Sequence, residues 1–172
     1  MNRSCKQVIQ IPKFLHSLTV LSSFKLGNHS NQEVDLQRFN VRCNSRECLD
    51  RIQECGNAKD FADLVNIGYG KVICISFSTA GGIGEEHDKK ILNVLNDIIN
   101  FIRALHNGRN DEWQPSFQPL PLFSRRTEEQ IEEEGANEEM EAQMNNNGYN
   151  RRIKYYAKYA KAVILNHFII TI

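Results

Sequence analysis

The segment Glu85–Leu105 constrains the fold of this chain more than any other part of the sequence. Its apolar residues recur at intervals of three and four positions, which places them on one stripe of an α-helix. Glu85 and Glu86 open the segment, where the helix dipole favours negative charge. Because a long apolar stripe must be covered, the chain needs a core around this helix. The stripe consists of Ile91, Leu95, Ile98, Ile99, Ile102 and Leu105.

Four other segments show the spacing of helices. Asn150–Phe168 has apolar residues on one side and basic residues on the other. Shorter or less regular patterns predict helices over Pro12–Phe24, about Ser45–Glu54 and Asn57–Ile67. The predicted fold class is therefore all-α, either an irregular helical bundle or a short armadillo- or HEAT-like helical repeat.

The segment Lys71–Thr79 is ambiguous within this all-α prediction. Its run from Val72 to Phe77 is rich in β-branched residues and could form either a buried strand or a short helix. Length alone favours a strand, but the choice between strand and helix stays open.

The 172 residues suffice for one domain with a substantial core. We divide this domain into an N-terminal helical region over residues 1–106, a connector over residues 107–127, and a C-terminal part over residues 128–172. The connector contains most of the prolines and the single tryptophan. The C-terminal part contains an acidic segment and the amphipathic helix.

The charges cancel overall but are segregated locally. Lysine and arginine number 21, as do aspartate and glutamate, so the net charge does not attract nucleic acid, and a nucleic-acid partner is not expected. Eight of the 14 glutamates lie in Glu128–Glu141, whereas Arg151–Lys161 contains five basic residues and no acid. We expect these two blocks to pair within the molecule; the alternative is that the basic helix contacts phosphates.

The cysteines indicate a reducing compartment. There are five, which is an odd number, and no Cys-x-x-Cys pair occurs. The N-terminus lacks an uninterrupted signal-peptide core, and the apolar stretch Ala162–Ile172 is too short to span a bilayer. A cytoplasmic or nuclear protein without a membrane partner is expected.

Two pairs of segments resemble one another. Leu95–Ile99 and Leu165–Ile169 both begin with Leu-Asn on a predicted helix, and glycine turns at Val65–Gly68 and Glu133–Gly135 precede them. This arrangement resembles the armadillo-type helical repeat, whose units combine a glycine turn with a packed third helix, over Phe61–Ile169 at most. The resemblance implies a non-enzymatic protein–protein interaction module, with the connector as an insertion, and the chain could be a fragment of a longer array.

The alternative function is a nucleotide-cofactor-binding oxidoreductase. The loop Ser78–Gly84 resembles the cofactor loop of short-chain dehydrogenases, and Gly81, Gly82 and Gly84 would contact the phosphates. Residues Phe77 and Ser78 replace the leading Thr-Gly of that motif, and no Tyr-x-x-x-Lys pair follows. We therefore favour a simple glycine turn and expect no cofactor.

Candidate contact residues are found in two places. The connector combines aromatic residues with prolines and could dock in a groove as an extended ligand, or it could pack back on its own domain. The basic side of the last helix is the second candidate. Cysteines at Cys43, Cys48 and Cys55 lack the paired spacing of a zinc site, so no metal site and no catalytic residue is predicted. The predicted partner-binding residues are Trp113, Phe117, Pro119, Pro121, Phe123, Arg151, Lys154 and Lys158.

Overall fold

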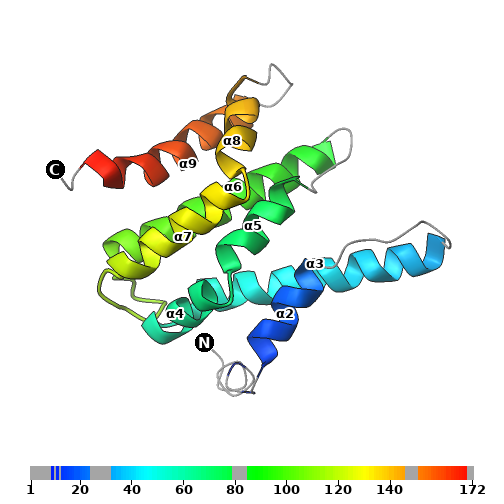
Figure 1. The fold of residues 1–172 in the computed structure, drawn as a ribbon, viewed down its shortest axis with the longest axis horizontal. Coiled ribbons are helices and arrows are strands. Elements are labelled where there is room, and N and C mark those ends of the chain that lie inside the picture. Colours follow the sequence, from blue (N-terminus) through cyan, green and yellow to red (C-terminus); the bar gives the residue numbers. More distant parts are fainter. Residues whose placement is uncertain are drawn as a thin grey trace.

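The computed structural model describes residues 9, 11, 13–23, 32–78, 85–145 and 151–169, and these form an all-α fold (Figure 1). Within them the only β-type pairing is a single bridge, between Arg109 and Phe117, so the predicted fold class is confirmed. The helices are α2 (Phe14–Ser22), α3 (Gln32–Cys55), α4 (Ala58–Asn66), α5 (Tyr69–Ser78), α6 (Glu85–Asn107), α7 (Pro121–Glu133), α8 (Ala136–Asn145) and α9 (Arg151–Ile169).

Local sequence signals set several of the helix boundaries. The Asn57 side chain accepts hydrogen bonds from the first turn of α4, and the Asp60 carboxylate accepts one from the Asn57 amide, which completes a capping box. A proline, Pro121, occupies the first turn of α7, where its missing N–H costs nothing. Tight turns at Gly68 and Gly135 separate α4 from α5 and α7 from α8, and both glycines have positive φ, at 82° and 70°.

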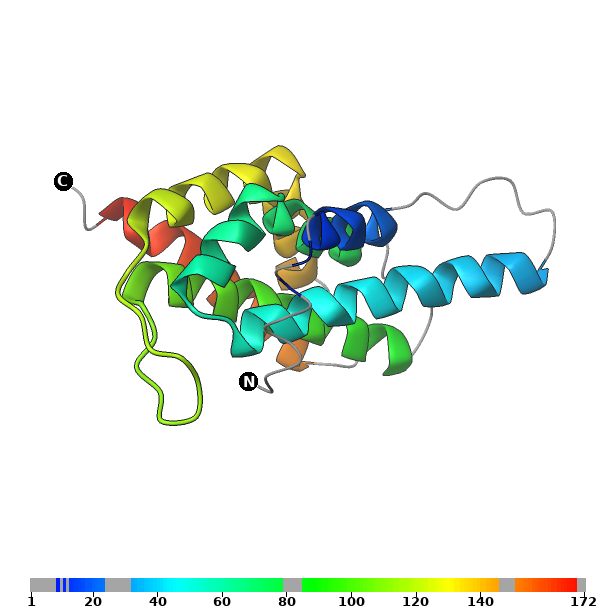
Figure 2. The ribbon, with the colours of Figure 1, turned by 90° about the horizontal axis from the view of Figure 1, so that it is seen from below.

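Helix α6 lies at the centre of the packing. All six residues of its predicted apolar stripe are buried, with exposed fractions of 3% or less. The helices α4, α5 and α6 pack against α7, α8 and α9, respectively. The pair α2–α3 lies on the α4–α5 side, and the N-terminal part of α3 extends beyond the rest of the molecule (Figures 1 and 2).

Of the two structures left open for Lys71–Thr79, the described residues form the helix, because Tyr69–Ser78 is helix α5; the strand that length alone favours does not form there. Three successive side chains, Val72, Ile73 and Cys74, are all buried. Neighbouring elements therefore cover α5 on more than one side, and such a helix carries no polar stripe that would reveal its period.

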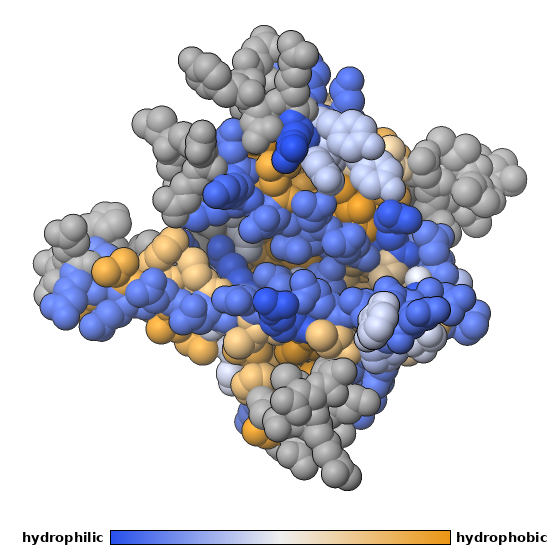
Figure 3. Space-filling view, turned by 180° about the vertical axis from the view of Figure 1, so that it is seen from behind, coloured by the Kyte–Doolittle hydropathy of each residue, from blue (hydrophilic) through white to orange (hydrophobic). Residues whose placement is uncertain are grey.

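Two other boundaries differ from the sequence predictions. Helix α3 begins at Gln32, more than three turns before the expected start, and Leu36 and Val41 on its projecting part are exposed. Figure 3 shows apolar surface along this projecting part. An unburied helix does not need a regular apolar stripe, which explains why the pattern was weak there. The predicted connector over 107–127 ends early, because residues 121–127 belong to α7. None of the described helices is both long and apolar enough to cross a membrane.

Candidate functional site

The outer face of α9 displays two stacked tyrosines. The inner side of the helix is buried against α6 and α8, through residues that include Ile153, Ala157 and Ala160. On the opposite side, the rings of Tyr155 and Tyr159 lie one turn apart with centroids separated by 6.4 Å and an interplanar angle of 18°. Their exposed fractions are 65% and 37%, which is high for residues that normally bury most of their ring.

Basic side chains surround the tyrosines. We define the basic–aromatic face as Arg152, Lys154, Tyr155, Lys158 and Tyr159, all of which are exposed. The side chain of Arg151, another predicted contact residue, lies outside the described residues. Two predicted contact residues, Lys154 and Lys158, are thus on one exposed surface together with two aromatic rings that the prediction did not include.

The predicted pairing of the acidic and basic blocks is confirmed at one ion pair. Lys161 of α9 forms an ion pair with Glu141 of α8. The acidic block also bonds elsewhere, since the Nζ of Lys71 lies 2.6 Å from a carboxylate oxygen of Glu133. Within the described part of the chain, Lys154 and Lys158 have no ion pair, and their charges therefore face solvent.

The position of Arg152 and Lys154, in the first turn of α9, is unfavourable for the helix itself. The first turn of α9 contains no acidic residue, although negative charge is what the N-terminal end of a helix dipole favours. Positive side chains near this end cost roughly 0.3–1 kcal/mol each at low ionic strength. The helix thus has positive charge where negative charge would stabilise it. Such a loss of stability is common at surfaces that serve a function.

The connector divides into packed and exposed aromatics. Phe117 lies 4.9 Å from the ring of Phe61, and Phe123 packs against the core. Both rings therefore pack back on their own domain, which is the second of the two roles expected for the connector. Pro121 begins α7, and Pro119 is exposed. Only Trp113, with 88% of its surface exposed, projects from the loop.

One arginine fixes the base of this loop. The guanidinium of Arg109 donates hydrogen bonds to the carbonyl oxygens of Gln53, Glu54 and Gly56 at the C-terminal end of α3, at 2.8–3.2 Å. It also lies 4.9 Å from the centre of the Phe61 ring. A cation at this place satisfies carbonyls that the helix leaves without partners and opposes the negative end of the dipole. The loop is therefore tied to α3, and its tip carries the exposed tryptophan.

A buried Ser–His–Glu cluster joins α6 to α7. The Nε2 of His106 lies 2.8 Å from the Oε1 of Glu128, and both side chains are less than a tenth exposed. In a catalytic triad the serine oxygen bonds to one ring nitrogen of the histidine and the carboxylate bonds to the other. Here the Ser124 Oγ lies 3.0 and 3.1 Å from the two ring nitrogens of His106, so it does not have the position of a nucleophile. Because Ser124 is also fully buried, a substrate cannot reach it. The cluster holds the two helices together.

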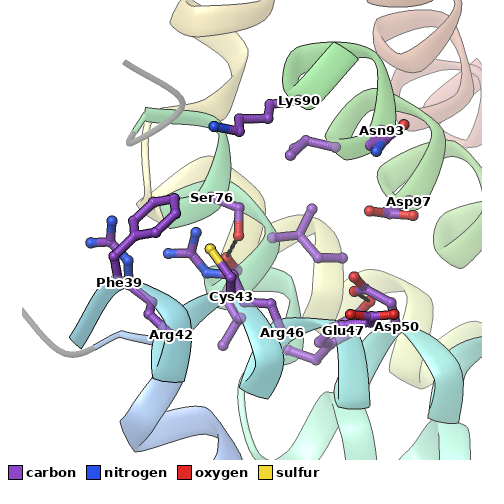
Figure 4. A pocket seen from close by; sticks show the side chains of 14 residues that line it. Phe39, Arg42, Cys43, Arg46, Glu47, Asp50, Ser76, Lys90, Asn93 and Asp97 are labelled. Atoms are coloured by element: carbon purple, nitrogen blue, oxygen red, sulfur yellow. Dashed lines mark hydrogen bonds between the residues drawn. The ribbon is translucent and has the colours of Figure 1, made fainter. Parts of the chain in front are cut away.

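A polar pocket between α3, α5 and α6 has no counterpart in the predictions from sequence (Figure 4). At one end the Tyr69 hydroxyl lies 2.7 Å from Asp50 Oδ1 and 2.7 Å from Gln53 Oε1. The tyrosine hydroxyl donates to the Asp50 carboxylate, and this bond lowers the pKa of Asp50 in part against the effect of burial. Burial raises the pKa of Asp50 and, more strongly, that of the nearby Asp97, to about 8. Two carboxyl groups separated by 47 positions in the sequence are thus brought together only by packing.

The alternative cofactor site loses its structural premise. A dinucleotide loop follows a strand, whereas the segment before Ser78–Gly84 is helix α5. The glycines Gly81, Gly82 and Gly84 lie outside the described residues. Among the residues that are described, no group of three or more histidine, cysteine or acidic side chains is placed to hold a metal ion.

Comparison with known proteins does not assign this chain to a family. No protein-family model, no curated protein and no solved structure matches the chain significantly. Its function must therefore be argued from the chemistry of its surfaces.

Proposed function

We propose that this protein is a non-enzymatic helical interaction module that binds an acidic protein segment on the basic–aromatic face of α9. The observation that carries this proposal is the exposed tyrosine stack beside two lysines that have no ion pair among the described residues. Tyrosine rings supply contact area at low entropic cost, and they are enriched in protein interfaces. Unpaired lysines beside them select a partner of opposite charge and speed its association.

A protein partner fits this face better than a nucleic acid does. The chain as a whole carries no net charge, whereas nucleic-acid-binding surfaces are usually part of a strongly basic domain. The positive charge here is confined to one helix, and α8 beside it belongs to the acidic segment. Such a mixed environment repels a long polyanion but accommodates a short acidic segment lying along α9.

We also propose that α4–α6 and α7–α9 are two copies of one three-helix unit similar to the armadillo type. Each has two short helices followed by a long one, with lengths of 9, 10 and 23 residues in the first and 13, 10 and 19 in the second. A glycine with positive φ separates the short helices in both units. The packing of each helix on its counterpart supports this interpretation, because stacked repeats bury their apolar faces against one another.

The binding proposal can be tested by fluorescence anisotropy with a short, labelled peptide of glutamates interrupted by leucine and phenylalanine. Charge reversal in Lys154→Glu/Lys158→Glu should weaken binding at least about tenfold, and raised salt should weaken binding to the unchanged protein. The matched control is Lys59→Glu/Arg103→Glu, which changes the net charge equally at exposed positions outside α9 and should have less than about a threefold effect.

Three results would contradict the proposal. They are equal weakening by the two charge-reversed variants, no binding of the peptide at low salt, and tighter binding of an oligothymidylate than of the peptide. The last result would replace the acidic protein with a nucleic acid as the partner of this face.

A reducing compartment, cytoplasmic or nuclear, is the location we infer for this activity. The four described cysteines, Cys43, Cys48, Cys55 and Cys74, are free thiols. Burial raises the pKa of the Cys74 thiol to about 12, so this group stays protonated and unreactive.

A further inference from the structure

The pocket between α3, α5 and α6 has a volume of about 400 Å³ and shares no residue with the basic–aromatic face. This volume lies within the range of small-molecule sites in proteins. Its walls are mostly polar or charged side chains, and the charges are sorted along its length (Figure 4). Asp50 and Asp97 lie at one end and Arg42 and Lys90 at the other, and Arg46 lies between the two ends, close enough to Asp50 to lower its pKa.

The acidic end is formed by Asp50 of α3 and Asp97 of α6, which face one another (Figure 4). Asp50 bonds to Tyr69, but no described residue donates a hydrogen bond or offers a cation to the Asp97 carboxylate. Removal from water and the nearby Asp50 raise the pKa of Asp97, so the ionised form of Asp97 lacks compensation among the described residues. A cation placed between the two carboxylates would supply it.

The basic end is built around one aromatic ring. Arg42 of α3 and Lys90 of α6 lie 5.7 and 5.5 Å from the centre of the Phe39 ring. The Nε of Arg42 is buried and has no hydrogen-bond partner among the described residues. A buried N–H group without an acceptor is rare in folded proteins and costs free energy, which a bound anionic group would recover.

The same order of charges occurs on both helices. On α3 the basic Arg42 precedes the acidic Asp50 by eight positions, and on α6 Lys90 precedes Asp97 by seven. At 1.5 Å per residue these intervals correspond to about 10–12 Å along each helix axis. The arginine and lysine side chains can reach back over part of this distance. A ligand bridging both ends therefore needs opposite charges separated by several bonds.

We propose that this pocket binds a small linear zwitterion, with its ammonium group between Asp50 and Asp97 and its carboxylate against Arg42 and Lys90. An ω-amino acid has the required chemistry. An α-amino acid without a charged side chain is too short, because its ammonium and carboxylate groups are bonded to the same carbon atom.

Isothermal titration calorimetry with three probes tests the proposal: 6-aminohexanoate, hexylammonium and hexanoate. The first carries both charges on the same chain length, and the other two each carry one of them. The zwitterion should bind at least about tenfold more tightly than either single-ended probe. Equal affinity for hexylammonium and 6-aminohexanoate would show that the basic end takes no part in binding. Absence of binding by all three probes would show that the pocket is not a site for such ligands.

Two variants locate the binding. Asp97→Asn should weaken 6-aminohexanoate at least about tenfold, because the amide keeps the shape of the side chain but not its charge. Asp111→Asn, which removes an exposed acid from the loop after α6, should leave the affinity unchanged. Circular dichroism confirms that both variants are folded. Unchanged affinity in folded Asp97→Asn would overturn the assignment of the ammonium to this end.

Discussion

Replacement of Asp97 by asparagine should stabilise the protein, and the gain should depend on pH. The pKa of Asp97 is about 8 in the folded chain against 3.8 for a free aspartate, because the group is largely removed from water and lies near Asp50 and Glu54 of α3. Tyr69 of α5 lines the same pocket and adds no positive charge, and the cations that line it, Arg42, Arg46 and Lys90, do not counter this rise in the pKa. Since the folded state holds the proton more tightly than the unfolded state, ionisation of Asp97 opposes folding.

The sign and the pH window follow from the two pKa values. Below about pH 4 the Asp97 carboxyl is protonated in both the folded and the unfolded state, and it does not lower the free energy of unfolding. Between about pH 4 and pH 8 the cost rises as the unfolded state releases its proton first, and above about pH 8 it is constant. Four pKa units would correspond to about 6 kcal/mol. Water at the open side of the pocket screens the charges, so we expect about 2–3 kcal/mol.

Urea unfolding of both proteins measures this difference. Asp97→Asn should match the unchanged protein near pH 4 and exceed its free energy of unfolding by about 2–3 kcal/mol near pH 8. Asp111→Asn is the control, because its carboxyl is exposed and should contribute less than about 0.5 kcal/mol at either pH. A gain that is the same at both pH values, or a loss of stability near pH 8, would refute the reasoning.

Four further substitutions test other contacts, each by its effect on the free energy of unfolding. Glu128→Ala should cost about 3–5 kcal/mol, because it removes the buried carboxylate that faces His106; a cost below about 1 kcal/mol would be inconsistent with a buried pair. Arg109→Ala should cost about 2–3 kcal/mol through loss of the α3 cap, and Arg109→Lys should recover only part of this, which equal costs would contradict. Gly68→Ala should cost about 1–2 kcal/mol from the positive φ alone, since no atom lies within 4 Å of the added Cβ. Trp113→Ala should change stability by less than about 0.5 kcal/mol, and a larger loss would mean that the ring is packed.

The parts of the fold that the sequence predicts well are the helices with one buried side. Helices α6 and α9 alternate buried and exposed residues at helical spacing, so their positions follow from the pattern of apolar residues. The position of helix α5 does not follow from such a pattern, because its neighbours bury Val72, Ile73 and Cys74 in succession. The sequence did not predict the projecting part of α3 for the opposite reason, since too little of this part is buried to require a regular apolar pattern.

The candidate site was predictable only where it lies on one helix. Lys154 and Lys158 belong to a basic block that the sequence displays directly, and the tyrosines of the same face could have been found by placing that block on a helical wheel. The pocket could not be found in this way. Asp97 lies within a segment that the sequence associates with a repeat, and its proximity to Asp50 depends on how α3 and α6 pack.

Amide chemical-shift mapping of the isotope-labelled protein during titration with the acidic peptide tests the central claim most directly, because it reports where the peptide binds. The largest shifts are expected on α9 between Arg152 and Tyr159, and they should disappear in Lys154→Glu/Lys158→Glu. Shifts centred on the Trp113 loop or on α3, with α9 unchanged at saturation, would contradict the claim.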